Sequence, residues 1–352
     1  MAHPVKWIAA AAVGVLASAA TFANEAAPTQ KSADSEAAAA ETPTAAQPAP
    51  RHDAMSSAAA VYGTYQSDVT DVKDNPLSST GDIDAALNNL GGHNPGSLSQ
   101  GWLAYSALVA SQSPEYRDAV RDIESFYGRD RVLRGMRNDL RYARSLEGGD
   151  LAVGSALAAI DADSRRLSDV AAFVKEQAYT LQGAGWAKAK IRNSSAKADE
   201  IGTRSRTGSP ARATLLAAMS APDFNTALVH AGGAGAPSLW DGVSGAATTI
   251  RVPSFVGSSF SSPAQTRIRS GKEHTADRIA TLAAYHVLSI DGAEVGQLQT
   301  ALADREAQSC LNMAQLNLQQ CVAAAHQHHE LPFCISEHAL NDISSCIGEV
   351  TK

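Results

Sequence analysis

Four cysteines restrict the fold of this chain more than any other feature of its sequence. They are the only cysteines present, and they lie close together at Cys310, Cys321, Cys334 and Cys346. On one helix, the first two would be about 16 Å apart along the axis, and the last two about 18 Å apart. A disulfide bond needs Cα atoms within about 7 Å of each other. Pairing within either segment is therefore excluded if both segments are helical.

A break between Cys321 and Cys334 resolves the pairing. Residues 328–332 supply it with two histidines, a glutamate, a leucine and a proline suited to the first turn of a helix. Folding back there places Cys321 opposite Cys334 and Cys310 opposite Cys346. We therefore predict a helical hairpin with these two nested disulfides. The 12 residues from Cys334 to Cys346 advance about 120° beyond whole helical turns. The second helix must therefore bend or fray for both sulfur atoms to face the first. A thiolate metal site is the alternative.

The N-terminus is typical of a secretory signal. Lys6 is followed by an apolar run over 7–16 and then by small residues. We expect cleavage after Ala23, with Ala20 as a second choice, so that the mature chain begins at Asn24. An uncleaved anchor is the alternative, because the apolar stretch approaches bilayer length. Export to the periplasm would also suit disulfides, which persist in oxidising compartments.

Composition divides the chain into five parts. The signal peptide 1–23 precedes a stretch over 24–53 that is rich in Ala, Pro, Thr, Glu and Ser and has no hydrophobic period, which predicts a disordered linker. The parts 54–202 and 273–352 carry the start and stop signals of helices. Between them, 203–272 is rich in Gly and Ser and is predicted to be a long loop, either disordered and variable or covering a ligand.

The helical parts predict an all-α fold, a multi-helix body with the C-terminal disulfide hairpin. Ser113 is a favourable N-cap before a proline, and Gly128 should end that helix. Leu167, Val170 and Val174 belong to one apolar stripe. On such signals we expect helices over 80–90, 114–127, 164–190, 279–290 and 294–324.

Arginines form the most distinctive charge pattern. With 36 acidic and 29 basic residues the formal net charge is -7, which argues against a nucleic-acid partner. Guanidinium groups suit phosphate and carboxylate groups, such as those of anionic lipid, lipopolysaccharide or peptidoglycan. A helix would align four of them on one face: Arg134, Arg137, Arg141 and Arg144. The alternative is internal pairing with nearby acids: Asp118, Asp122, Glu124, Asp130 and Asp139.

Histidines gather at the predicted hairpin turn. His326, His328 and His329 precede Glu330, and His338 follows Cys334 by four residues. Clustered imidazoles can bind zinc or copper. A solvated polar turn is the alternative, since the spacing matches no familiar metal motif.

Signatures of catalysis are sparse. The chain has no nucleophile elbow, phosphate-binding glycine loop or dinucleotide fingerprint. His286 lies on an apolar stripe, where a hydrogen-bonded core histidine is expected, and Asp161 and Asp163 have ordinary spacing. A hydrolase would need acids brought together from distant helices.

Four segments resemble a group of uncharacterised exported helical proteins of alphaproteobacteria. They are GWLAYSALVA at 101–110, KEQAYTLQ at 175–182 with Trp186, CLNMAQLNLQQC at 310–321 and FCISEHAL at 333–340. The likeness covers about 90–350 and implies a Gram-negative periplasm without implying an activity. The cysteine layout also resembles the twin-cysteine hairpins of mitochondrial intermembrane-space proteins, although the spacings here are longer.

These observations together predict an exported, non-enzymatic periplasmic protein. It would act as a binding or scaffolding component that contacts an envelope protein or an anionic envelope polymer, without a cofactor. The alternative is a metal-binding protein that uses the histidine turn, and a third possibility is a hydrolase of envelope polymers.

Overall fold

The computed structural model describes residues 53–243, 266–290 and 294–351. The predicted signal peptide and nearly all of the predicted linker lie outside these ranges. Within them the chain forms helices and no β-strand, with isolated bridges from Lys190 to Gln327 and from Ile268 to Thr351. The all-α prediction is confirmed. None of the described helices is long and apolar enough to cross a membrane.

Before residue 244 the helices are α1 (Ala54–Asp74), α2 (Thr80–Leu90), α3 (Pro95–Ala110), α4 (Pro114–Tyr127), α5 (Arg129–Asn138), α6 (Arg141–Arg144), α7 (Gly149–Leu181), α8 (Ser194–Thr207), α9 (Ala213–Met219), α10 (Pro222–Ala231) and the 3-10 helix η1 (Leu239–Gly242). After residue 265 they are α11 (Glu273–Val287), α12 (Val295–Leu302), α13 (Arg305–Ala324), the 3-10 helix η3 (His328–Glu330), α14 (Leu331–Cys334), the π-helix η4 (Ile335–Asn341) and α15 (Asp342–Gly348).

Local signals explain the helix ends that were predicted and some that were not. Helix α4 has Ser113 as N-cap and Gly128 as C-cap, as predicted, although the Ser113 side chain makes no capping hydrogen bond. The single helix expected over 294–324 is instead α12 and α13. Asp304 separates them, because its side chain accepts hydrogen bonds from the backbone N–H groups of Glu306 and Ala307. Helix α7 starts earlier than expected, directly after Gly148, whose φ is 72°.

The prediction of one long loop over 203–272 is wrong for the residues of this range that the structure describes. Residues 213–219 and 222–231 are helical, and η1 follows. Alanine and leucine favour α9, while a proline in the first turn starts α10. Phe224 and Trp240 bury their side chains in the core, so tertiary packing fixes this segment. Residues 244–265 lie outside the described part of the chain.

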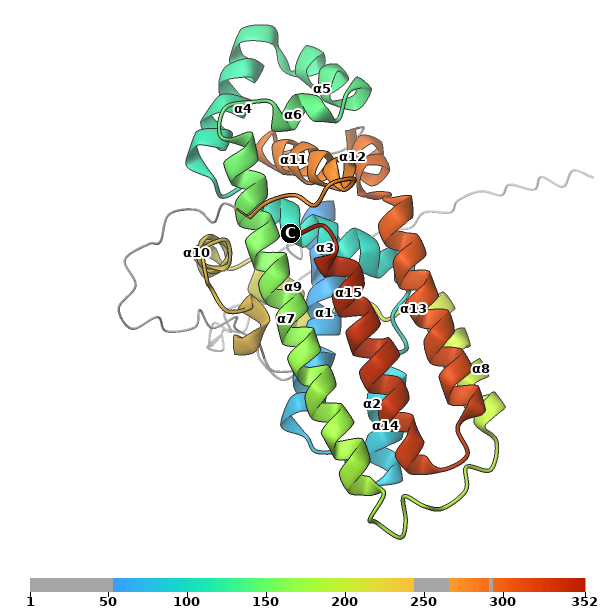
Figure 1. The fold of residues 1–352 in the computed structure, drawn as a ribbon. Helices are drawn as coiled ribbons and strands as arrows, with labels where there is room; N and C mark the ends of the chain where they lie inside the picture. Colours follow the sequence, from blue (N-terminus) through green and yellow to red (C-terminus); the bar gives the residue numbers. More distant parts are fainter. Residues whose placement is uncertain (1–52, 244–265, 291–293, 352) are drawn as a thin grey trace, which may run out of the picture. The chain divides into compact units, whose positions relative to one another are not determined.

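The core forms where small residues let helices approach closely. Helix α1 packs against α3, and a Cβ atom at Gly101 would lie 2.9 Å from the carbonyl oxygen of Ala58. Both helices also pack against α7 (Figure 1). The face of α1 in this contact carries Tyr62 and Tyr65, neither of which is exposed to solvent. The core is therefore centred on α1, α3 and α7.

The disulfide hairpin is confirmed. Cys310 pairs with Cys346 and Cys321 with Cys334, with Cα atoms 5.7 Å and 5.6 Å apart. Helix α13 descends on one side of the hairpin and α14, η4 and α15 return on the other (Figure 1). The π-helix η4 solves the angular problem, because its wider turns advance each residue by less than an α-helix does. Cys334 and Cys346, on the returning helical segment of the hairpin, can then both face α13.

Candidate functional site

The predicted arginine stripe does not form on a single helix. Helix α5 ends at Asn138, and the side chain of Asp139 accepts a hydrogen bond from the backbone N–H of Arg141 at 3.0 Å. This local turn competes with the helix and separates the two halves of the stripe. Arg141 is exposed and pairs with Asp139, whereas Arg144 turns inward.

Arg144 has a structural role. Its Nε lies 2.6 Å from the Oδ1 of Asp277 on α11, and its Nη1 lies 3.2 Å from Asp150. Burial lowers the pKa of Arg144, but its hydrogen bond and charge interactions with Asp277 and Asp150 together raise the pKa above its usual value. Of the four predicted arginines, the structure therefore leaves two, Arg134 and Arg137, exposed on α5.

Arg131 joins these two on the outer face of α5. All three are exposed, and none forms an ion pair with another described residue. Offsets of three and six residues spread them over about 120° of the helix. Asp130 is exposed near them, in the first turn where the helix dipole favours an acid. The outer face of α5 therefore has an excess of positive charge.

Two aromatic rings stand next to this face. At the end of α4, Phe126 is 80% exposed and Tyr127 51% exposed, with ring centroids 4.7 Å apart. Gly128 follows with φ of 81° and lets the chain turn at once into α5. Arg121, on α4, is also exposed and without a partner among the described residues. We call this set the arginine–aromatic surface: Arg121, Phe126, Tyr127, Arg131, Arg134 and Arg137.

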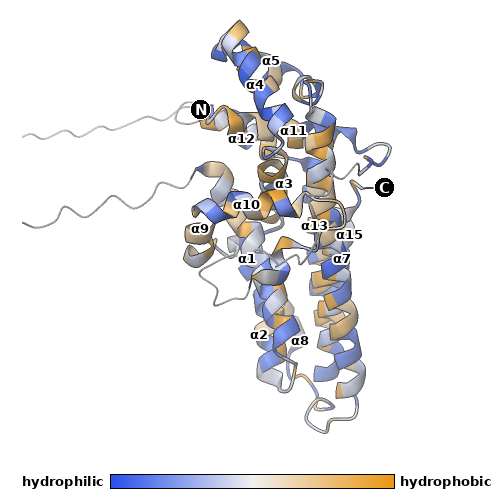
Figure 2. Cartoon of the chain, turned by 90° about the vertical axis from the view of Figure 1, so that its left-hand side faces the viewer, coloured by the Kyte–Doolittle hydropathy of each residue, from blue (hydrophilic) through white to orange (hydrophobic). Residues whose placement is uncertain are grey.

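The hairpin of α4 and α5 that carries this surface is held both at the start of α4 and beside the turn at Gly128. The hydroxyl of Tyr116 donates a hydrogen bond to the carbonyl of Ala280 at 2.7 Å. Arg129 donates to the carbonyl of Leu288 at 2.6 Å and pairs with Glu124 and Glu294. Figure 2 shows α4 and α5 at one end of the helices, with both polar and apolar residues along them. The surface is thus preformed.

A second feature is a groove of about 690 Å³ over α7. One face of α7 forms its floor, and its walls are the end of α1 and residues 235–241. The lining mixes both charges with apolar side chains: Lys73, Asp74, Ala162, Arg165, Arg166, Asp169, Val170, Phe173, Gly235, Ala236, Pro237, Ser238 and Asp241. Its volume is that of a small-molecule site.

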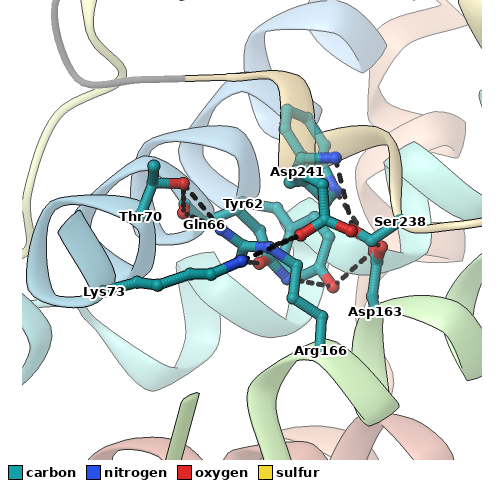
Figure 3. A network of polar contacts seen from close by, with 9 residues as sticks. Tyr62, Gln66, Thr70, Lys73, Asp163, Arg166, Ser238 and Asp241 are labelled. Carbon is teal, nitrogen blue, oxygen red and sulfur yellow. Dashed lines mark hydrogen bonds and ion pairs between the residues drawn. The ribbon is translucent and has the colours of Figure 1, made fainter. Parts of the chain in front are cut away.

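Asp163 lies fully buried beneath the groove and accepts three hydrogen bonds (Figure 3). Ser238 Oγ donates at 2.6 Å, Tyr62 Oη at 2.9 Å and Trp240 Nε1 at 3.1 Å. Burial raises the pKa of Asp163 to about 7, although the three donors and nearby Arg166 oppose the rise. Asp163 therefore ties the segment around η1 to α1 and α7.

Arg166 extends the same network toward the groove. It donates to Gln66 Oε1 at 2.5 Å, to Thr70 Oγ1 at 2.6 Å and to Asp241 Oδ1 at 3.1 Å. Lys73 lies 3.9 Å from the same Asp241 oxygen. Figure 3 shows these groups converging from α1, α7 and η1. Their polar atoms are used within the protein, so they stabilise the fold and leave little to offer a ligand.

A hydrolase would need reactive acids in this groove. Asp163, whose pKa is perturbed, does not line the groove, and both of its oxygens accept hydrogen bonds. Asp241 does line the groove but is held by Arg166 and Lys73. Asp74 and Asp169 also line the groove. A hydrolase stays an untested prediction.

The predicted histidine cluster is dispersed. His329 Nδ1 lies 3.3 Å from the carbonyl oxygen of Ala187, and His338 Nδ1 lies 2.8 Å from Asp342. The His328 Nδ1 atom is buried without a hydrogen-bond partner, while His326 is exposed. In the described part of the chain no three His, Cys, Asp or Glu side chains are placed to hold a metal ion. Zinc or copper binding by these residues stays a prediction.

His286 is only half-buried and lies at a cavity of about 210 Å³ beside Met55 and Leu298. Burial lowers its pKa. No described residue forms a hydrogen bond with its ring, so the expected hydrogen-bonded core histidine is not found. Asp53 and Ser289 line the same cavity.

Sequence reasoning missed the ring pair and the buried network. The signal for the rings was an aromatic pair immediately before a glycine at a helix end. For the network, the signal was Asp163 between Ile160 and Leu167, an acid on an apolar helical stripe. Its partners Ser238 and Trp240 are 75 and 77 residues away, so no local pattern reveals them.

No family model, curated protein or solved structure matches the chain. The likeness to exported proteins of alphaproteobacteria therefore stays a prediction. The groove mixes both charges, with Asp74 and Asp169 exposed beside the paired Arg166 and Asp241. The arginine–aromatic surface instead presents several exposed arginines that form no ion pair with described residues.

Proposed function

We propose that the protein is an exported, non-enzymatic component of the periplasm that binds an anionic partner in the cell envelope. The contact is the arginine–aromatic surface of α4 and α5. The observation that carries this proposal is the set of three exposed arginines on α5 without an ion pair in the described structure. Their guanidinium forks match phosphate and carboxylate groups, which anionic envelope material presents in quantity.

The surface is a local exception in an acidic protein. The net charge of the whole chain is -7, yet charges beyond about 8 Å are largely screened at physiological salt. An anionic partner touching α5 therefore interacts chiefly with the local arginines. Each cation close to an anionic membrane surface contributes about 1 kcal/mol to binding. Three of them correspond to roughly a hundredfold in affinity.

Co-sedimentation with a washed envelope fraction tests the proposal. The variant Arg131→Gln, Arg134→Gln, Arg137→Gln should bind roughly a hundredfold more weakly than the wild type.

The control removes the same charge elsewhere. Arg192, Arg204 and Arg206 are also exposed, and their triple glutamine variant should bind as the wild type does. Equal loss in both variants would show a general charge effect, and no loss in either would reject the arginine–aromatic surface as the contact.

Export is a separate part of the proposal, which the disulfides support because oxidising compartments preserve them. The intact mass of protein purified from a periplasmic extract tests it. We expect a chain that starts at Asn24 and carries no metal, and whose mass rises by four hydrogens on reduction. A retained leader or unpaired thiols would contradict export as proposed.

A further inference from the structure

We infer that the anionic partner is a lipid bilayer and that Phe126 and Tyr127 enter its interfacial layer; this rests on the proposed function. Phe126, at 80% exposure, is the most exposed large apolar side chain in the described part of the chain. An aromatic side chain left in water forgoes the favourable free energy of burial. Two such rings side by side favour a partner that removes them from water.

The place of the rings favours a bilayer over a protein pocket. They stand directly before the turn at Gly128, where an added Cβ atom would meet nothing within 4 Å. At Gly128 itself there is no wall within 4 Å for a partner side chain to pack on, although Arg129 beside it contacts Leu288 and Glu294. A bilayer needs no such wall, because its headgroup region deforms around an inserted ring.

The orientation of the rings argues against a glycan partner. Their planes are inclined at 82°, so the edge of one ring faces the other. A sugar polymer stacks best on a flat, continuous aromatic face, which Phe126 and Tyr127 do not share. Tyr127 also carries a hydroxyl at the end of an apolar ring, the combination that is enriched where membranes meet water.

Arg121 and Arg131 lie close to the rings along the chain. Arg121 precedes Phe126 by five residues, about 7.5 Å along α4, and Arg131 follows the turn on α5. Interfacial helices bury their apolar groups about 5–10 Å deep. If α4 stands steeply on the bilayer, rings at the boundary of the acyl chains would place the Arg121 guanidinium near the lipid phosphates. One anchor of this size binds weakly, and rings together with cations supply the two signals that stable membrane attachment needs.

Vesicle binding tests this inference. The exported protein, purified from a periplasmic extract, is sedimented with phosphatidylcholine vesicles that contain or lack phosphatidylglycerol. The variant Phe126→Ser, Tyr127→Ser should bind the anionic vesicles at least about tenfold more weakly than the wild type. Its binding to soluble dextran sulfate should be unchanged. The matched control is Phe173→Ser, Tyr179→Ser on α7, where both rings are also exposed, and it should bind vesicles normally.

A depth probe gives a second readout. Tyr127→Trp should show quenched, blue-shifted fluorescence on vesicles that carry brominated acyl chains. The inference is overturned if the double serine variant binds vesicles as the wild type does, or if it loses vesicles and dextran sulfate equally. Either outcome leaves the proposed function intact if the triple arginine variant still loses envelope binding. If the triple arginine variant binds the envelope normally, the proposed function itself fails.

Discussion

Two groups of charged side chains in this protein have opposite surroundings. Beneath the groove, Asp163 and Arg166 are almost completely buried, and their polar atoms bond to groups of α1, α7 and η1. On α5, Arg131, Arg134 and Arg137 are exposed, and no described acid pairs with them. Removing a buried charge from its partners is costly, whereas an exposed arginine contributes little to folding.

The contrast separates stability from function. Buried groups with internal partners position the helices, and exposed groups without partners remain available for contact. A groove above the first group is therefore weaker evidence of binding than its volume suggests.

The largest effect should follow Asp163→Ala. The change leaves Ser238, Tyr62 and Trp240 without their shared acceptor in a dry environment. We expect the free energy of unfolding in urea to fall by about 3–5 kcal/mol. The control is Asp169→Ala, an exposed acid six residues later on the same helix, which should change stability by less than about 0.5 kcal/mol. Equal effects of the two changes would remove the distinction between the groups.

A matched pair of arginine changes sharpens the comparison. Arg166→Gln loses the fork that joins Gln66, Thr70 and Asp241 and should destabilise the fold by about 3 kcal/mol. Arg134→Gln should leave the unfolding midpoint nearly unchanged. Thermal unfolding of both variants side by side measures the difference. A strong loss at Arg134 would mean that the hairpin arginines serve the fold after all.

The pH dependence of stability should come from the buried group. Burial raises the pKa of Asp163 to about 7, while a carboxyl in an unfolded chain titrates near 4. The native state then binds more protons, so this group's contribution is full below pH 4 and is lost as the pH rises toward 7. The stability advantage of the wild type over Asp163→Asn should shrink between pH 4 and 8, and a constant difference would contradict the raised pKa.

The smallest predicted effect concerns a single surface charge. Arg121→Gln removes one cation of the arginine–aromatic surface and should weaken binding to anionic vesicles by about fivefold. Because arginine does not titrate in proteins, binding should be the same at pH 5 and pH 8. Co-sedimentation at the two pH values, with Arg192→Gln as control, checks both statements. A marked pH dependence would point to a histidine or carboxyl group instead.

The sequence predicted features that depend on residues close together in the chain better than features that depend on distant residues. The two disulfides followed from axial distances on short helices, and the Gly128 stop followed from local backbone preference. The π-helix η4 could not be foreseen, although the angular problem it solves was visible in the spacing of Cys334 and Cys346.

The two charged groups show the same dependence on distance. Arg134 and Arg137 were identified from their spacing. The turn at Asp139 depends on a local hydrogen bond with Arg141, and the inward path of Arg144 depends on a distant contact with Asp277. Asp163 received no special role because Tyr62 and Trp240 reach it from far along the chain. Sequence periodicity shows which face of a helix is apolar, and it does not show which polar group is buried with a partner.

Amide hydrogen exchange in the presence and absence of anionic vesicles tests the central claim most directly. The proposed contact predicts added protection confined to the hairpin of α4 and α5, residues 114–138, with α7 and residues 235–241 unchanged. Protection centred on the groove, or none on the hairpin while the protein is bound, would contradict the claim that the arginine–aromatic surface is the contact.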